Sequence, residues 1–291
     1  MGRLPAKDYD AVISRIGKNF SYGCAVLEHL NNNLKIFATQ TSTGIKAAAD
    51  KLISAQKISA AKIRVPKTVL GDRACHAEWM VNQVGKLPAM AKSLTGSQGK
   101  GVYLLTDPQQ TNIFLENFYS RKEKILLQKF IDGNSKDIRA IIVDGEVVAA
   151  MERTAKPGEV RANISRGGTG KKIELTDPDK DIAVRAARAC GLEVAGVDLM
   201  KDSHGTTYCI EVNGNYGYEL EKITGIDIST PLIKFCEKNY KKGNKANLDS
   251  TSALFGFSPI VGYKSKTFIQ SVQSKDENFV ETINRIQNEY L

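Results

Sequence analysis

The alternation of apolar and polar positions along the chain predicts a mixed protein of helices and strands. Short apolar runs rich in β-branched residues indicate strands, and apolar positions three to four residues apart indicate helices. The expected strands are 9–16, 34–38, 68–70, 87–94, 102–105, 125–131, 137–143, 146–153, 194–200 and 207–212. The expected helices are 21–30, 43–57, 73–84, 107–119, 178–190, 227–240 and 274–290.

The last pair of strands forms the most informative pattern, a β-hairpin with a polar turn centred on His204 and Gly205. With that turn, Asp198 lies directly opposite Glu211. Asn213 shares their face because it is two residues from Glu211. Two carboxylates and an amide oxygen are the hard oxygen ligands that Mg²⁺ prefers. A solvated acidic face is the alternative, although opposed carboxylates repel each other unless a cation lies between them.

Two loops have the composition of anion-binding segments. Residues 95–101 (TGSQGKG) join two expected strands, and their glycines would let backbone amides approach an anion, with Lys92 just before them. Residues 156–170 mix cations with glycines, which suits a loop that folds over phosphate or carboxylate. An ordinary hairpin turn and a surface loop are the alternatives. The glycine loop does not match the Walker pattern, so a P-loop is disfavoured.

Composition narrows the functional classes. The chain has 291 residues, 42% hydrophobic and 25% charged, as in a globular protein of two domains or one elaborated domain. Its net charge of +9 favours an anionic partner such as nucleotide phosphates or an acidic peptide. Nucleic acid is not favoured, because the lysines are dispersed and not interleaved with aromatic residues. The five cysteines are far apart and fit buried thiols in a reducing compartment. Without a membrane-length apolar run or a signal-peptide pattern, a cytoplasmic protein with no membrane partner is expected.

Together these features resemble the ATP-grasp ligases of the RimK type, the glutamate ligases that modify the C-terminus of a ribosomal protein. The resemblance preserves order from Tyr9 to about Cys236. It is carried by the stretches YDAVISRIG, KSLTGSQGKGV, KDIRAIIVDGEVVAAMERTAKPGEVRANISRGG, AGVDLM, IEVNGNYG and EKITGIDI.

The resemblance implies an α+β fold of the ATP-grasp class, in which two α+β subdomains clasp ATP. It implies a shortened N-terminal α/β segment at 1–45, an ATP-grasp domain at 46–240 and a C-terminal tail with a terminal helix at 241–291. Within the ATP-grasp domain, a nucleotide lid region covers about 46–130 and a metal-binding subdomain about 131–240. The family places a further strand–helix–strand unit before Tyr9. An exposed sheet edge that could pair with another subunit is therefore expected.

The resemblance also implies nucleotide-binding roles by position. The lysines that contact nucleotide phosphates correspond to Lys51 and Lys92. The lid-like phosphate loop corresponds to Gly96, Ser97, Gln98, Gly99 and Gly101. The hinge that reads adenine, largely through backbone groups, corresponds to Gln128, Lys129 and Phe130. A further nucleotide-binding position corresponds to Asp137.

Catalytic and metal-binding roles follow in the same way. The loop near the transferred phosphate corresponds to Arg161 and Asn163. Contacts to a carboxylate or acyl phosphate are expected from Arg139 and Arg153. The Mg²⁺ ligands correspond to Asp198, Glu211 and Asn213, in agreement with the hairpin geometry.

The implied activity is ATP-dependent amide formation through an acyl phosphate. The expected cofactors are ATP and Mg²⁺, with Mn²⁺ as an alternative ion. The expected partners are a peptide or protein carboxylate and an amino-acid donor, glutamate first. Two alternative functions stay open: the same chemistry on a small-molecule carboxylate, and a non-catalytic nucleotide-binding regulatory subunit. Assembly as a homo-oligomer is left open as well.

Overall fold

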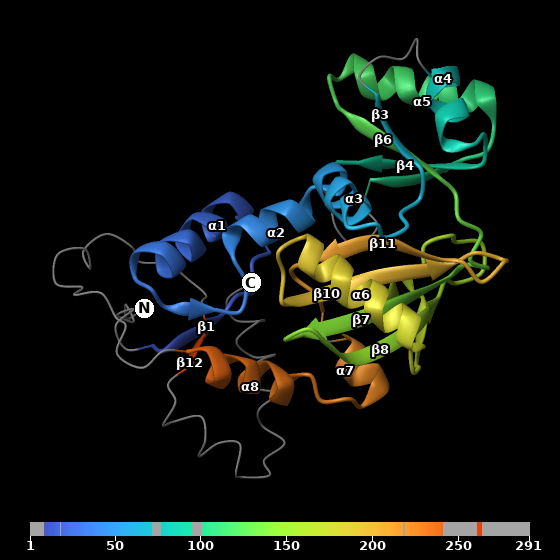
Figure 1. The fold of residues 1–291 in the computed structure, drawn as a ribbon. Helices are drawn as coiled ribbons and strands as arrows, with labels where there is room; N and C mark the ends of the chain where they lie inside the picture. The colour runs from blue at the N-terminus through green and yellow to red at the C-terminus, as the bar shows by residue number, and fades with distance from the viewer. Residues whose placement is uncertain are drawn as a thin grey trace. The chain divides into compact units, whose positions relative to one another are not determined.

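The computed structural model describes residues 9–17, 19–71, 77–94, 101–217, 219–240 and 261–263. It divides the chain into two compact units (Figure 1). Residues 1–42 and 229–291 belong to the first unit, and residues 43–228 form the second. The domain boundaries expected from the sequence remain a prediction.

The first unit contains a three-stranded sheet in the order β12-β1-β2. Strand β1 (Ala11–Ile13) pairs in parallel with β2 (Phe37–Ala38) and antiparallel with β12 (Val261–Tyr263). Helices α1 (Phe20–Glu28) and α8 (Ser229–Asn239) accompany it, with a π-helical turn at His29–Asn33. Strand β12 pairs with one edge of β1, and the sheet ends at β12 and β2. The pairing of a sheet edge with another subunit remains a prediction. Strand β12 comes from the expected C-terminal tail at 241–291.

The second unit contains two antiparallel sheets. The smaller has the order β3-β6-β4-β5. Its strands are β3 (Thr68–Gly71), β4 (Ala89–Ser93), β5 (Val102–Leu105) and β6 (Ile125–Lys129). Helices α4 (Ala77–Val84) and α5 (Pro108–Ser120) lie on one face of this sheet (Figure 1). Their core includes Met80, Leu115, Ala91 and Leu127, so the intervening strand positions face the other way.

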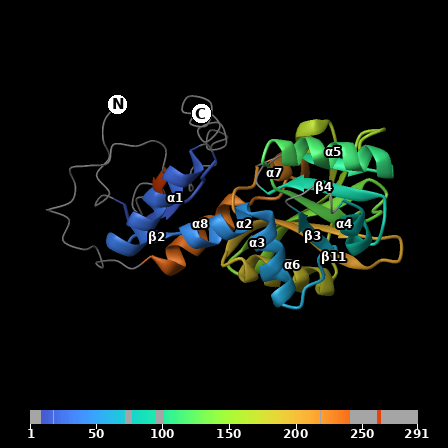
Figure 2. The same ribbon diagram turned by 90° about the horizontal axis from the view of Figure 1, so that it is seen from above.

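The larger sheet has the order β11-β10-β7-β8-β9. Its strands are β7 (Lys136–Val143), β8 (Glu146–Thr154), β9 (Thr169–Lys172), β10 (Val194–Lys201) and β11 (Thr207–Asn213). Helix α6 (Asp177–Ala189) contacts four of these strands and runs along the sheet (Figure 2). The short helix α7 (Glu219–Thr224) contacts β8 and β9.

Most of the expected elements are present, with three differences in the second unit. The expected helix 43–57 is two helices, α2 (Ser42–Ala49) and α3 (Lys51–Ala60). The break falls at Asp50, whose extended backbone and carboxylate cap α3 by accepting from Leu52 N (2.9 Å) and Ile53 N (3.0 Å). The expected loop 156–170 contains a 3₁₀ turn at Ile164–Arg166 and the start of β9. Helix α7 was not expected.

Local turn chemistry explains several elements that match those expected from the sequence. The hairpin between β7 and β8 turns at Asp144 and Gly145, both at positive φ (53° and 78°). Gly191 follows α6 at φ 77°, as expected of a C-terminal cap.

The expected terminal helix 274–290 and the residues Gly96–Gly99 lie outside the described residues. No described helix is long and apolar enough to span a bilayer.

Candidate nucleotide and metal site

The hairpin β10–β11 has the pairing expected from the sequence at its functional end. Asp198 lies opposite Glu211, and Gly196 lies opposite Asn213. The turn itself differs, because Lys201 pairs with Thr207 and the turn is therefore centred on His204 alone. A bulge in β11 at this point shifts the register by one residue and restores the pairing of the two carboxylates.

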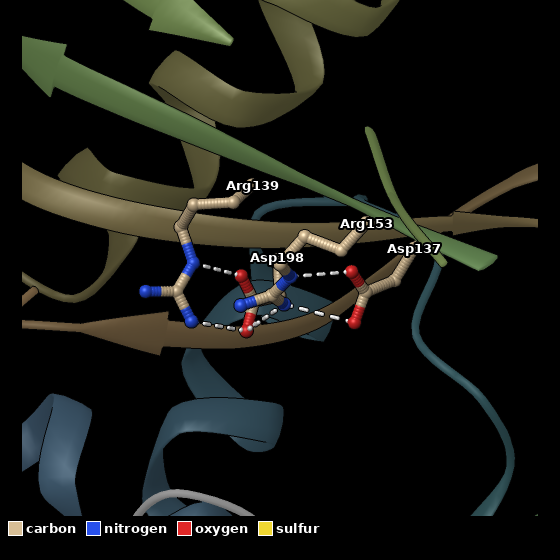
Figure 3. A network of polar contacts seen from close by, with 4 residues as sticks. All are labelled: Asp137, Arg139, Arg153 and Asp198. Carbon is tan, nitrogen blue, oxygen red and sulfur yellow. Dashed lines mark hydrogen bonds and ion pairs between the residues drawn. The ribbon is translucent and has the colours of Figure 1, made fainter. Parts of the chain in front are cut away.

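A chain of alternating charges crosses three neighbouring strands (Figure 3). Arg139 on β7 binds Asp198 on β10 through Nε and through Nη2, the latter 2.8 Å from Oδ2. Arg153 on β8 reaches the same Oδ2 at 3.1 Å. It also forms two bonds with Asp137 on β7, at 2.6 and 2.8 Å. The register brings these groups together because Asp198 lies opposite Arg139, and Asp137 lies opposite Arg153.

These four groups are almost withdrawn from solvent, and their side chains are between 5% and 15% exposed. Burial by itself would raise the pKa of Asp198, but the guanidinium groups of Arg139 and Arg153 lower that pKa below its ordinary value. Asp137 behaves differently, because burial and the charge of Asp198 raise its pKa against the pull of Arg153. The two carboxylates raise the pKa of Arg153 despite its burial. Asp198 is thus held as a carboxylate.

Two lysines contribute the positive charge on the other side of the site. Lys92 on β4 donates to Gln128 Oε1 at 2.6 Å. Burial, together with the charge of Lys51, lowers the pKa of Lys92 to about 8, while Glu211 and Asp198 oppose that shift. Lys51 begins helix α3, and its backbone N–H donates to Leu94 O at 3.1 Å, just beyond the end of β4. This bond ties the start of α3 to the strand that carries Lys92.

One cleft brings the expected site residues together. Every expected site residue that the structure describes, apart from Gly101, lines it: Lys51, Lys92, Gln128, Lys129, Phe130, Asp137, Arg139, Arg153, Arg161, Asn163, Asp198, Glu211 and Asn213. Gly101 is described at φ 70° and its carbonyl accepts from Ser93 N at 2.9 Å. The structure also adds apolar lining residues that the sequence analysis did not name: Pro66, Met90, Val102, Ile131, Met200 and Ile210. Strand alternation could have indicated Met90 and Met200, because each lies two residues from a charged site residue.

The expected adenine hinge is partly engaged within the protein. The backbone N–H of Lys129 donates to Lys67 O at 2.8 Å, and the side chain of Gln128 is turned toward Lys92. Lys129 itself is exposed at the end of β6.

The loop between β8 and β9 holds Arg161 firmly. Its Nε and Nη2 bind Glu159 at 2.8 and 2.6 Å, and its Nη1 donates to Val102 O at 3.2 Å. The bonds from Arg161 lower the pKa of Glu159 to about 2. Val102 belongs to the smaller sheet, so Arg161 connects this loop to β5. Asn163 begins the 3₁₀ turn that follows.

The ligand set expected for Mg²⁺ is consistent with the geometry. Glu211 lies opposite Asp198, and its carboxylate forms no hydrogen bond with another described residue. Among the described residues, Asn213 Nδ2 is buried without a partner, so this amide faces the cleft unsatisfied. Asp198 accepts three bonds, which leaves one of the roughly four acceptor sites of its carboxylate open. The described residues contain no group of three or more His, Cys, Asp or Glu side chains that could hold a metal ion by themselves. These residues therefore fit an ion that takes its remaining ligands from substrate phosphates.

Comparisons with known proteins agree with this fold. A model of the RimK-like ATP-grasp domain matches residues 48–236. Probable alpha-L-glutamate ligase 2 of Shewanella sp. is 38% identical over 240 residues, which cover 81% of this chain and 80% of that protein. A protein of the same name from Shewanella baltica is 39% identical over 245 residues, 83% of this chain and 80% of its own length.

Solved structures show the same fold at low identity. The D-alanine–D-alanine ligase of Bacillus anthracis, complexed with ATP, has a TM-score of 0.61 at 18% identity and covers 80% of this chain and 81% of its own. The RimK domain protein of Sphaerobacter thermophilus has a TM-score of 0.60 at 18% identity, with 81% and 86% covered. The ligase PsnB, complexed with a minimal precursor, Mg and ADP, has a TM-score of 0.63 at 19% identity, with 79% and 77% covered.

The two facing antiparallel sheets and the charged cleft between them thus define an α+β protein of the ATP-grasp class. Within that class, the chain belongs to the RimK-like ATP-grasp family. It is a ligase that forms C–N bonds, in a family that binds ATP.

Proposed function

We propose that this ligase adds an amino acid, glutamate, to the C-terminal carboxylate of a peptide or protein through an acyl phosphate. The observation that carries the proposal is a single cleft that combines two lysines with a row of carboxylates and guanidinium groups. Phosphoryl transfer depends on positioning and charge neutralisation more than on a protein nucleophile.

In this proposal the lysines bind the nucleotide phosphates, and the hairpin holds the metal. Asp198, Glu211 and Asn213 would coordinate Mg²⁺, which neutralises phosphate charge when it is bound. Arg139 and Arg153 keep Asp198 ionised and fix its orientation. The apolar lining residues Met90 and Met200 offer a surface for a purine ring.

The reaction balances in two steps. A carboxylate oxygen of the acceptor attacks the γ-phosphorus of ATP, the bond from that phosphorus to the β–γ bridging oxygen breaks, and ADP leaves. The amino group of glutamate then attacks the carbonyl carbon of the acyl phosphate, the bond from that carbon to the phosphate oxygen breaks, and the amine loses a proton. The products are an amide, ADP and phosphate. Arg161 is placed to bind the transferred group if it exchanges its bond with Glu159 for one with phosphate.

Three observations support the choice of substrates. The relatives described above carry the name of glutamate ligases. A structural neighbour of the same fold, the ligase PsnB, has a solved structure in complex with a precursor peptide. The cleft loop and β9 also carry exposed Lys156, Lys171 and Lys172, whose charge is complementary to an acidic peptide.

The test is release of ADP from Mg-ATP in the presence of a pool of amino acids and of peptides with acidic C-termini, with the products analysed by mass spectrometry. We expect turnover that needs both substrates and adds the mass of glutamate to the peptide. Glu211→Gln should abolish ADP formation, whereas Glu174→Gln, an exposed carboxylate outside the cleft, should leave it unchanged.

Other outcomes would change the proposal. Turnover on free small carboxylates but not on peptides would favour a small-molecule ligase, as the name of the D-alanine–D-alanine ligase neighbour illustrates. Mg-dependent ATP binding without turnover under any condition would favour a regulatory subunit. Full activity of Glu211→Gln would refute the metal assignment.

A further inference from the structure

A chain of three hydrogen bonds crosses the smaller sheet beside the nucleotide cleft. Lys92 Nζ donates to Gln128 Oε1 at 2.6 Å, and Gln128 Nε2 donates to Thr68 Oγ1 at 2.9 Å. Thr68 Oγ1 donates in turn to Pro66 O at 2.8 Å. The sheet register explains the alignment, because Gln128 on β6 lies opposite Thr68 on one side and opposite Met90 on the other. Lys92 is two residues beyond Met90 and so shares its face.

The donors and acceptors in this series of hydrogen bonds fix the orientation of the Gln128 amide. A backbone carbonyl only accepts, so the single hydroxyl proton of Thr68 goes to Pro66 O. The hydroxyl oxygen must then accept, and the group that Gln128 offers it is the amide NH₂. This places the amide oxygen toward Lys92. The reversed amide would set a donor against an ammonium group that has only donors.

The amide oxygen of Gln128 affects how the charge of Lys92 is balanced. Its hydrogen-bond partner is a neutral oxygen rather than a carboxylate, so the contact orients the ammonium without neutralising it. Gln128 is itself buried, at 7% exposure, which restrains it from other arrangements. A carboxylate at that position would form an ion pair with Lys92 and compete with any anionic ligand.

We propose that Gln128 and Thr68 are positioning residues that hold the Lys92 ammonium oriented toward an anionic phosphate group of ATP, through a neutral hydrogen-bond partner in place of a carboxylate. The inference rests on the proposed function for the phosphate role of Lys92, whereas the orientation of Lys92 is a property of the ligand-free protein. Gln128 thus acts through its side chain, in addition to any backbone contact that the hinge makes with adenine.

The test compares Thr68→Val with Thr68→Ser. Valine keeps the shape and the strand preference of threonine but removes the hydroxyl, and serine keeps the hydroxyl. By calorimetry, Thr68→Val should weaken Mg-ATP binding about tenfold, and Thr68→Ser should restore it to within about twofold of the original protein. In a Lys92→Ala background, Thr68→Val should have no further effect, because the hydroxyl acts only through the lysine. Equal affinities of the valine and serine variants, or a full effect of valine without Lys92, would overturn the proposal.

A second measurement separates this inference from the proposed function. The rate at which a limiting amine-acylating reagent modifies Lys92 in the ligand-free protein, followed by mass spectrometry, reports the freedom of its ammonium. That rate should rise in Thr68→Val and return in Thr68→Ser, with Lys57 on the exposed side of α3 as an internal reference. An unchanged rate in both variants would overturn the positioning role. If the rate changes as expected but Lys92→Ala binds Mg-ATP normally, the phosphate role of Lys92 fails, and with it the proposed purpose of the arrangement.

Discussion

Lys92 is the residue through which burial and neighbouring charges would act on the proposed nucleotide binding. Burial lowers its pKa to about 8, so the side chain is cationic below pH 8 and loses its charge as the pH rises through that value. If the cation binds phosphate, the dissociation constant of Mg-ATP should be flat below pH 7.5 and should rise toward about tenfold per pH unit above pH 8. Calorimetry across this range would measure the bend. Lys92→Arg keeps its charge and should show no bend. The same bend in both proteins would assign it to another group.

Asp198 and Glu211 lie opposite each other but have different surroundings, so their substitution should have different consequences. Asp198 is buried against Arg139 and Arg153. Removal of its charge would leave both guanidinium groups beside a neutral amide in place of a carboxylate. We expect Asp198→Asn to lower the free energy of unfolding by about 3 kcal/mol. Glu211 has no such partner among the described residues, so Glu211→Gln should change that free energy by less than about 0.5 kcal/mol.

Both variants should lose ADP formation if both carboxylates bind the metal. Urea denaturation of the two proteins, with the ADP assay on the same samples, measures both quantities. Equal destabilisation by the two variants would contradict the structural role assigned to Asp198, and activity in either would contradict its role as a ligand.

Helix α3 shows the same coupling at the scale of an element. Asp50 caps the helix, and the helix begins with Lys51, which lines the cleft. Asp50→Ala should cost about 1 kcal/mol of stability and should also weaken Mg-ATP binding, because the first turn carries the lysine. Asp107 caps α5 in the same way, by accepting from Gln110 N at 2.8 Å, but its helix does not line the cleft.

Asp107→Ala is therefore the matched control for the cap at Asp50. It should lose similar stability without a change in ATP affinity. Thermal melting and calorimetry of both variants compare the two effects. A similar loss of affinity in both would show that the cap at Asp50 acts only through general stability.

The two hairpins of the larger sheet show what the sequence could and could not predict. The pairing of Asp198 with Glu211 was predicted correctly from a turn centred one half-residue away from its true position, because a bulge in β11 compensates for the difference. The turn at Asp144 and Gly145 lies in the two-residue gap between the expected strands 137–143 and 146–153. However, a regular register from that turn would set Asp137 opposite Glu152, and a second bulge, in β8, sets it opposite Arg153 instead.

The charged chain of Figure 3 was therefore not predictable from alternation alone, because a one-residue slip moves every side chain to the other face. The break at Asp50 was missed for a different reason. The alanine-rich run around it has high helix propensity, and a capping carboxylate outweighed that preference. Strand β12 was missed because a three-residue strand is defined by its partner β1 rather than by its own pattern.

At the scale of the whole second unit, the bond from Arg161 to Val102 joins the loop after β8 to the smaller sheet. Glu159 orients Arg161 through two side-chain bonds, and its carboxylate also accepts from the backbone N–H groups of Val160 (2.9 Å) and Arg161 (3.2 Å). One carboxylate therefore organises both the loop and the connection between the sheets. A neutral amide in its place keeps the size of the side chain but cannot accept from all four donors.

Glu159→Gln should thus loosen this connection while the two sheets keep their own cores. Hydrogen exchange should accelerate by about tenfold or more in residues 155–163 and 102–105, and it should be unchanged in β7 and β10, whose pairing is independent of the loop. The pKa of Glu159 is about 2, below the ordinary value, so its contribution to stability is present above the unfolded pKa and is lost as the pH falls from about 4.5 toward 2. At neutral pH the protection factors of these residues in the original protein, after correction for the intrinsic exchange rate, should not change with pH, because Glu159 stays ionised there. Acceleration spread evenly over both sheets would instead mean that Glu159 supports the unit as a whole, and no acceleration at 102–105 would mean that the bond to Val102 does not restrain the smaller sheet.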